Sequence, residues 1–191
     1  MAQASEAFCR LARSSRRELE HLLLVGDTPN MDALDGGVYR GFNHSPVTAT
    51  LRIRKFLKEF FRSNNGDLEG RNARVRQNRL EDPWIGLPSD AAPKRYGYFS
   101  VRPVAPEERD NAYLHAVLFD YGTGRSPSYA PWRLLRDYVV RVNRGSDELL
   151  LGKAYAVIGP GRLPLGFFVL ERRRGEDDEA GVRNKRNGYS R

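Results

Sequence analysis

The sequence is poor in the features that define several classes of protein. Cys9 is the only cysteine among 191 residues, which excludes an intramolecular disulfide and a cysteine-based zinc site within one chain. No apolar run approaches the roughly 20 residues that a membrane-spanning helix needs. The first 25 residues carry acidic side chains among the apolar ones, unlike the core of a signal peptide. We therefore expect a cytoplasmic protein.

Motifs for metal binding and nucleophilic catalysis are also missing from the sequence. The three histidines, His21, His44 and His115, stand alone, without the spacing of a metal site. The glycines in 122–124 and 159–161 are typical of turns, because neither group opens a helix that could bind phosphate. No Gly-x-Ser-x-Gly elbow occurs. We expect no metal, no cofactor and no nucleophilic catalysis.

The net charge of +8 and the pI near 9.9 favour a negatively charged partner, but the charge is not concentrated. Basic residues are spread along the whole chain without a long block, which argues against nucleic acid. A chain of this length buries roughly 70% of its unfolded surface as one domain. We expect a single domain over residues 1–172 and a charged, disordered tail over 173–191, where apolar residues are scarce.

Two segments have the spacing of amphipathic helices. Residues 5–25 place Phe8, Leu11, Leu19 and Leu22 on one face, and Gly26 ends the segment. Residues 47–62 predict a second helix, packed on or across the domain with its basic face in water. This basic face would consist of Arg52, Arg54, Lys55 and Lys58. Contact of that face with an anionic membrane surface is the alternative. The apolar face of this second helix would consist of Ile53, Phe56, Leu57, Phe60 and Phe61.

Most of the remaining chain is typical of strands. About seven are expected, at 37–43, 72–80, 96–102 and 112–122 and as a three-stranded antiparallel meander within 136–173. A flat sheet of this size would leave two unpaired edges and one uncovered apolar face, whereas closure into a barrel removes both problems. The fold class is therefore mainly β (α+β), an antiparallel β-barrel with an N-terminal helix and a second amphipathic helix.

Several stretches resemble a group of bacterial lipocalin-like proteins, most of which have no known activity. They are "DGGVYRG", "FDYG" and "RDYVVRVNRGSDELLLGKAY" with the final "FFVLER", and the resemblance covers residues 32–172. Lipocalins carry Gly-x-Trp on the first strand, Thr-Asp-Tyr later, and a late arginine that packs over the tryptophan. Here these correspond to Gly37-Val38-Tyr39, Arg136-Asp137-Tyr138 and Arg172, so a tyrosine replaces the tryptophan. The resemblance implies a lipocalin-like barrel.

Polar residues on apolar strands are the candidate ligand contacts, because a barrel that holds a small molecule needs an apolar lining with a few fixed polar groups. We expect Arg40 or Lys153 to receive an acid or enol oxygen, and the tyrosines to stack on a ring. Aromatic side chains that fill the barrel are the structural alternative. The candidates are Tyr39, Arg40, His115, Asp120, Tyr121, Asp137, Tyr138, Arg141, Lys153 and Tyr155.

The function predicted first is binding of a small, largely apolar ligand with a polar or anionic end. The second hypothesis is a cyclase or isomerase that uses the same cavity to hold a substrate in a reactive shape. The third is a polyanion or membrane-surface binder that uses the basic face of the helix at 47–62.

Overall fold

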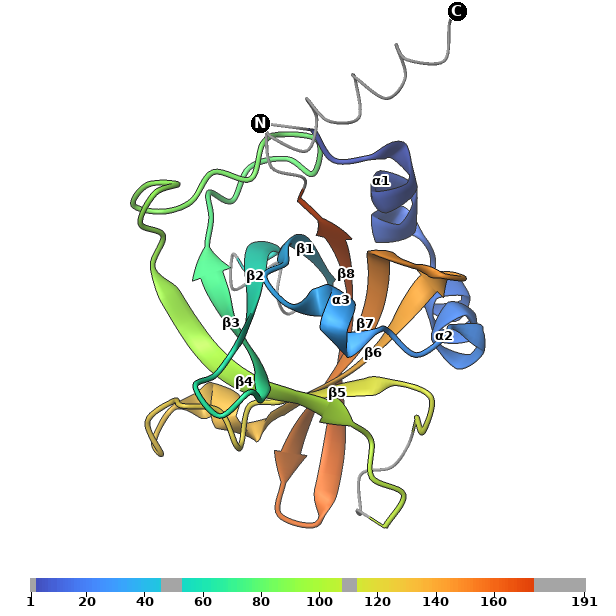
Figure 1. The fold of residues 1–191 in the computed structure, drawn as a ribbon. Coiled ribbons are helices and arrows are strands. Elements are labelled where there is room, and N and C mark those ends of the chain that lie inside the picture. Colours follow the sequence, from blue (N-terminus) through green and yellow to red (C-terminus); the bar gives the residue numbers. More distant parts are fainter. Residues whose placement is uncertain (1–2, 46–52, 108–112, 174–191) are drawn as a thin grey trace, which may run out of the picture.

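The chain forms a closed barrel of eight antiparallel strands (Figure 1). The computed structural model describes residues 3–45, 53–107 and 113–173. Each strand pairs with its neighbours in sequence, and the last closes on the first, which is the up-and-down topology of lipocalins. The predicted lipocalin-like barrel is therefore confirmed. The strands are β1 (Val38–His44), β2 (Lys55–Arg62), β3 (Leu68–Arg74), β4 (Arg95–Pro103), β5 (Val117–Asp120), β6 (Leu135–Asn143), β7 (Ser146–Ile158) and β8 (Gly161–Arg172).

The N-terminal helical segment is two helices rather than the expected single one. They are α1 (Glu6–Arg13) and α2 (Arg16–Val25), which pack on the outside of the barrel, α1 against β8 and β1 and α2 against β7 and β6 (Figure 1). The break falls at Ser15, which starts α2 with a capping box: its hydroxyl accepts from the Glu18 amide, and the Glu18 carboxylate accepts from the Ser15 amide. A third, short helix, α3 (Met31–Leu34), lies at one end of the barrel.

The second predicted helix is wrong wherever the structure describes it, because residues 55–62 form β2; residues 46–52 lie outside the described chain. Both faces of β2 are buried over its first four residues. Phe56 and Phe60 belong to the inner core of the barrel, while Leu57 packs under α1. A strand buried on both faces gives a nearly continuous apolar run, which can match helical spacing. Lys55 and Lys58 of the predicted basic face are buried, whereas Arg54 is exposed. The two lysines therefore cannot serve as a binding surface for membranes or polyanions.

Other strand predictions were closer to the structure. The meander of β6, β7 and β8 is confirmed, with turns at Gly145 and Gly159. The strand expected at 72–80 is shifted, since β3 ends at Arg74 and an irregular segment follows. The strand expected at 112–122 is shortened to the four residues of β5. The tail proposed for 173–191 falls outside the described residues from 174 onward, so it stays a prediction.

None of the helices in the described chain is long and apolar enough to cross a membrane.

The apolar core has an inner and an outer part. The inner part lies inside the barrel, and the outer part lies between the barrel wall and α1, α2 and the β3–β4 loop. Because of this outer layer, both faces of β7 are largely apolar: one faces the barrel interior and the other faces the outer part of the core.

The long β3–β4 loop is fixed to the barrel by a buried lysine. The Nζ of Lys55 donates to Asn78 Oδ1 at 2.5 Å and to the carbonyl oxygens of Arg79 and Asp82 at 2.9 and 2.8 Å. It also lies 3.6 Å from the centre of the Trp84 ring. Burial lowers the pKa of Lys55 to about 8, against the attraction of Asp82. The lysine therefore still carries most of its charge at neutral pH.

Candidate functional site

The barrel interior holds a second buried lysine with three polar partners. The Nζ of Lys58 donates to Tyr121 Oη at 2.6 Å and to Asn72 Oδ1 at 3.1 Å, and forms an ion pair with Asp137 Oδ2 at 3.4 Å. The Tyr121 hydroxyl donates to the same Asp137 oxygen at 3.2 Å. Side chains of the ion pair are only 2% and 5% exposed. We call Lys58, Asn72, Tyr121 and Asp137 the inner cluster.

Aromatic rings enclose the amine of the inner cluster. The Nζ of Lys58 lies 4.5 Å from the centre of the Phe99 ring. The rings of Phe56, Phe119, Tyr121 and Phe168 have their centres 5.5, 5.4, 5.2 and 5.3 Å away. A cation gains from the negative ring faces, and more so away from water.

Three of these rings lie over glycines on the neighbouring strand. A Cβ at Gly152 would stand 2.1 Å from the Phe168 ring, and those at the other two glycines would be 2.2 and 2.4 Å from a ring. The absence of these side chains lets the rings lie against the barrel wall, so the centre is left to the lysine. The pairs, which are direct cross-strand partners, are Phe56 with Gly41, Phe99 with Gly70 and Phe168 with Gly152.

Burial controls the electrostatics of the inner cluster. Desolvation lowers the pKa of Lys58 and raises that of Asp137, while their mutual attraction opposes both shifts. Desolvation and the nearby Asp137 hold the pKa of Tyr121 well above its usual value. The lysine and aspartate balance each other's charge, so the cluster as a whole is neutral whether or not the proton moves between them.

The inner cluster lies toward the barrel end that carries the longer connections. Asn72 is two residues before the end of β3, Tyr121 directly follows β5, and Asp137 is two residues into β6. Trp132, in the loop between β5 and β6, packs against the inner core at this end. Its indole nitrogen donates to Ser126 Oγ at 2.9 Å, and its ring meets Tyr96 edge-on at 6.0 Å.

Of the candidate residues named from the sequence, Tyr39, Tyr121 and Asp137 belong to the barrel interior. Tyr121 and Asp137 are in the inner cluster, whereas Tyr39 lies nearer α3 and donates to the Asp147 carbonyl at 3.0 Å. The guanidinium of Arg172 lies 5.5 Å from the centre of the Tyr39 ring. This is the contact that the resemblance to lipocalins implied for the motif residue and the late arginine.

Three other candidates form ion pairs away from the inner cluster. Arg40 pairs with Glu171 at 3.3 Å and Asp120 with Arg136 at 2.8 Å, while Arg141 lies 3.8 Å from Asp27. The structure does not bring these three together with Lys58. Their role as ligand contacts stays a prediction.

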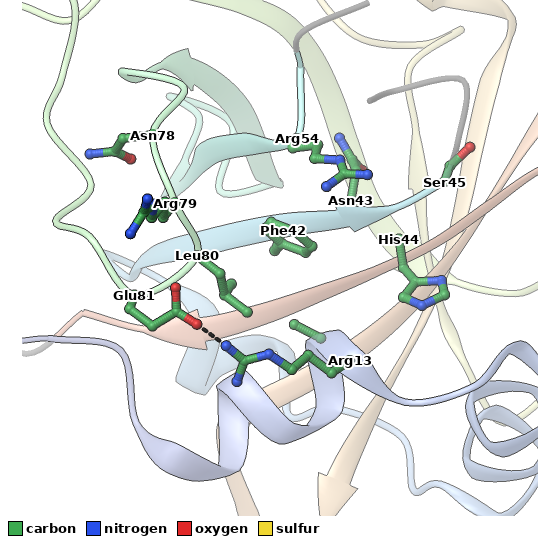
Figure 2. Close-up of a pocket in the computed structure, with 11 residues that line it drawn as sticks. Arg13, Phe42, Asn43, His44, Ser45, Arg54, Asn78, Arg79, Leu80 and Glu81 are labelled. Atoms are coloured by element: carbon green, nitrogen blue, oxygen red, sulfur yellow. Dashed lines mark ion pairs between the residues drawn. The ribbon is translucent and has the colours of Figure 1, made fainter. Parts of the chain in front are cut away.

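A pocket of about 580 Å³ opens on the outside of the barrel (Figure 2). It lies between the end of α1, the end of β1 and the β3–β4 loop. Phe42 and Leu80 form an apolar part, and an ion pair between Arg13 and Glu81 joins the helix to the loop. The remaining lining residues are Ala12, Asn43, His44, Ser45, Arg54, Asn78 and Arg79.

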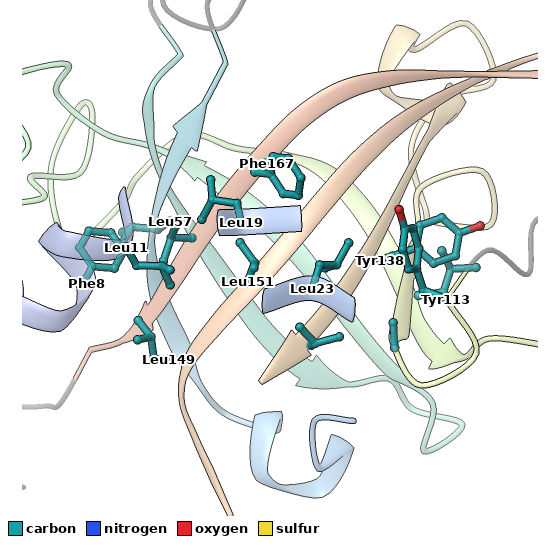
Figure 3. Close-up of a cluster of buried hydrophobic side chains, with 14 of the residues drawn as sticks. Phe8, Leu11, Leu19, Leu23, Leu57, Tyr113, Tyr138, Leu149, Leu151 and Phe167 are labelled. Carbon is teal, nitrogen blue, oxygen red and sulfur yellow. The ribbon is translucent and has the colours of Figure 1, made fainter. Parts of the chain in front are cut away.

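The last four candidates gather under α2, outside the barrel. The Nζ of Lys153 donates to both Glu20 carboxylate oxygens, at 2.8 and 2.7 Å, and to the Tyr113 hydroxyl at 2.9 Å. Tyr155 and Tyr138 pack on Tyr113, and Figure 3 shows Tyr113 and Tyr138 together in this layer. We call Lys153, Glu20, Tyr113 and Tyr155 the outer cluster. Nearby, His115 Nε2 lies 2.8 Å from the Leu23 carbonyl oxygen of α2.

In the outer cluster, the hydrogen bonds of Lys153 together outweigh the effect of burial on its pKa. Burial alone would lower the pKa of Lys153, but hydrogen bonds from its ammonium to Glu20 and Tyr113 raise it. Burial raises the pKa of Tyr113 to about 12. Both groups therefore keep their protons at neutral pH, and the cluster joins α2 to β7.

Sequence reasoning missed Lys58 and Asn72. Lys58 was assigned to the water-facing side of a helix, and Asn72 to the start of a solvated strand. The signal was present in "KFLKEFF": as a strand, this stretch places Lys58 between Phe56 and Phe60 on one face. If the stretch is a strand with its phenylalanines in the core, Lys58 is buried between them.

No family model matches the chain, and no curated protein sequence matches it. One solved structure similar to this chain is the siderocalin Ex-FABP, which functions through dual ligand specificities. The two chains are 9% identical, the match covers 81% of this chain and 87% of that one, and the TM-score is 0.39.

Proposed function

We propose that the barrel binds a small, largely apolar molecule whose polar group is held by the inner cluster. The observation that carries this proposal is Lys58, an amine buried among aromatic rings inside the barrel. Burial of an ion costs several kcal/mol, and well-packed apolar residues often stabilise a core as well as a buried ion pair does. A barrel that served only as a scaffold would gain little from such a lysine, whereas ligand sites combine apolar walls with a few fixed polar groups.

The ion pair between Lys58 and Asp137 limits which polar groups a ligand can carry. Asp137 already neutralises Lys58, so a carbonyl or hydroxyl oxygen that takes the place of Tyr121 or Asn72 can accept from the amine without adding net charge. A carboxylic acid can enter only if Asp137 takes up a proton, and burial, which raises the pKa of Asp137, favours this. Both are ligands with a single oxygen-bearing end on an apolar body.

Tryptophan fluorescence offers a direct test. The chain has two tryptophans, so Trp84→Phe leaves Trp132, at the loop end of the barrel, as the only reporter. We expect 2-naphthaldehyde and 2-naphthoate to quench it with saturation. Lys58→Met/Asp137→Leu in the same background is the matched control, and it should bind both compounds about ten-fold or more weakly, because a lost hydrogen bond to a charged group costs that much.

The natural ligand requires a second measurement. Native mass spectrometry of the protein purified from its own host, followed by denaturation, would identify a released small molecule. Failure of both experiments, with no quenching and no released molecule, would contradict the proposed function.

A second candidate, an acid–base isomerase, is favoured by the contact between amine, phenol and carboxylate in the inner cluster. Proton transfer by positioned groups of this kind contributes to catalysis in many enzymes. The test is exchange of the methyl protons of 2-acetylnaphthalene in D₂O, followed by NMR. Exchange that Tyr121→Phe and Lys58→Met both abolish would support an enzyme, and exchange at the rate without protein would leave binding alone.

A further inference from the structure

The pocket outside the barrel has positive charge without matching acidic groups. Three arginines line it, and Glu81 is the only carboxylate among its lining residues. That carboxylate is paired with Arg13. The guanidiniums of Arg54 and Arg79 have no acceptor among the residues that the structure describes, so their hydrogen-bond donors are available to a ligand.

Hydrogen bonds hold the backbone of both Arg54 and Arg79 in place. The carbonyl of Arg54 accepts from the Asn43 amide of β1 at 2.8 Å. The amide of Arg79 donates to Asp82 Oδ2 at 2.9 Å, and its carbonyl accepts from the buried ammonium of Lys55. The β3–β4 loop therefore holds the base of Arg79 firmly while leaving its guanidinium exposed. Such preorganisation lowers the cost of binding.

The apolar part of the pocket gives it a second kind of contact. Phe42 and Leu80 lie between Arg54 and the ion pair of Arg13 with Glu81 (Figure 2). The volume of about 580 Å³ lies in the range of small-molecule sites. Guanidinium groups match carboxylate, sulfonate and phosphate oxygens and also stack on flat rings.

We propose that this outer pocket binds an organic anion, with the apolar body on Phe42 and Leu80 and the charged group on Arg54 and Arg79. This proposal is independent of the barrel interior. The inner cluster offers a balanced pair of charges, whereas the outer pocket offers a surplus of positive charge beside an apolar surface.

The test uses two fluorescent probes that share an anilinonaphthalene body, 8-anilinonaphthalene-1-sulfonate and the uncharged N-phenyl-1-naphthylamine. We expect Arg54→Gln/Arg79→Gln to weaken binding of the sulfonate about ten-fold, since two charge-assisted contacts are lost. Binding of the uncharged probe should change less than about two-fold. Arg144→Gln removes an exposed arginine at the other end of the barrel and should leave both affinities unchanged.

Glu81→Gln gives a change of opposite sign, which loss of folding cannot imitate. It frees Arg13 and removes the only negative charge of the lining, so binding of the sulfonate should become about three-fold tighter. Lys58→Met/Asp137→Leu should have no effect on it, which separates this site from the barrel interior. Octanoate and octyl phosphate, as competitors, would distinguish a carboxylate from a phosphate ligand.

Three results would overturn the proposal. They are unchanged sulfonate binding in the double arginine variant, weaker binding in Glu81→Gln, or loss of sulfonate binding in Lys58→Met/Asp137→Leu. Displacement of the probe by inorganic phosphate alone, at the concentration at which octyl phosphate acts, would remove the role of Phe42 and Leu80. Thermal melting of each variant shows whether the fold is kept.

Discussion

The inner and the outer cluster both contain a lysine, a carboxylate and at least one tyrosine, and they differ in their access to water. In the outer cluster the side chains of Lys153 and Glu20 are 9% and 35% exposed, compared with 2% and 5% for Lys58 and Asp137. Hydrogen bonds raise the pKa of Lys153, whereas desolvation lowers that of Lys58. A partly hydrated pair is sufficient to fasten a helix. A fully buried pair loses the hydration of both ions, which is the cost on which the proposed ligand site rests.

The largest effect should come from breaking the inner pair. Asp137→Ala leaves the Lys58 amine buried without its counter-ion, which costs about 3 to 5 kcal/mol of unfolding free energy. Desolvation then holds the pKa of Lys58 in the folded state further below its unfolded value, so the variant should gain stability as pH rises toward 10. Urea denaturation at pH 7 and 9 measures both effects.

The matched control replaces both charges. Lys58→Met/Asp137→Leu should be about as stable as the wild type, because apolar residues of similar volume can replace a buried pair without loss. If this double variant were as unstable as Asp137→Ala, the ion pair would be needed for the fold itself. The contrast drawn between the inner and the outer cluster would then be wrong.

A smaller effect is expected from the glycine that carries a ring of the inner site. Gly152→Ala places a methyl group against Phe168 and should destabilise the protein by about 1 to 3 kcal/mol through overpacking. Thermal unfolding measures this, and quenching of Trp132 by 2-naphthaldehyde should weaken as the ring is pushed toward Lys58. Gly161→Ala, whose added Cβ would come no closer than 3.6 Å to another group, is the control. Equal stability of the two variants would contradict the close packing of Phe168 on Gly152.

The smallest effect should come from the outer pair. Glu20→Gln should cost about 1 kcal/mol or less, the usual value for a partly exposed ion pair. Because the folded pKa of Lys153 is raised, the pair stabilises the protein fully below the unfolded pKa of about 10.4. That stability is lost as pH rises through the higher folded value. Alkaline unfolding curves should therefore converge for Glu20→Gln and the wild type, and a constant difference above that range would contradict this assignment.

The barrel could be predicted from the sequence because its last third is locally consistent. In β6, β7 and β8, alternating apolar residues and turns at Gly145 and Gly159 agree with one another. In β2 the apolar residues do not alternate, because Leu57 on the outer face is covered by α1. Only the three-dimensional structure shows this cover. The break at Ser15 was readable, because Ser15 and Glu18 form a capping box.

The candidate site was predicted only in part, for a related reason. Tyr121 and Asp137 are on the inner face, but Lys153 and Tyr155 are on the outer one. Alternation separates the two faces of a strand without saying which is inside. That choice depends on where α2 packs, and the contact between α2 and β7 is distant in sequence.

The pairing of β8 with β1 also sets an order of events during synthesis. Val38–His44 is made early, yet its partner Gly161–Arg172 leaves the ribosome last among the eight strands. Until then the growing sheet has two open edges, each able to template pairing with another chain. Release of the final strand therefore converts an aggregation-prone nascent chain into a sheet without edges in a single step.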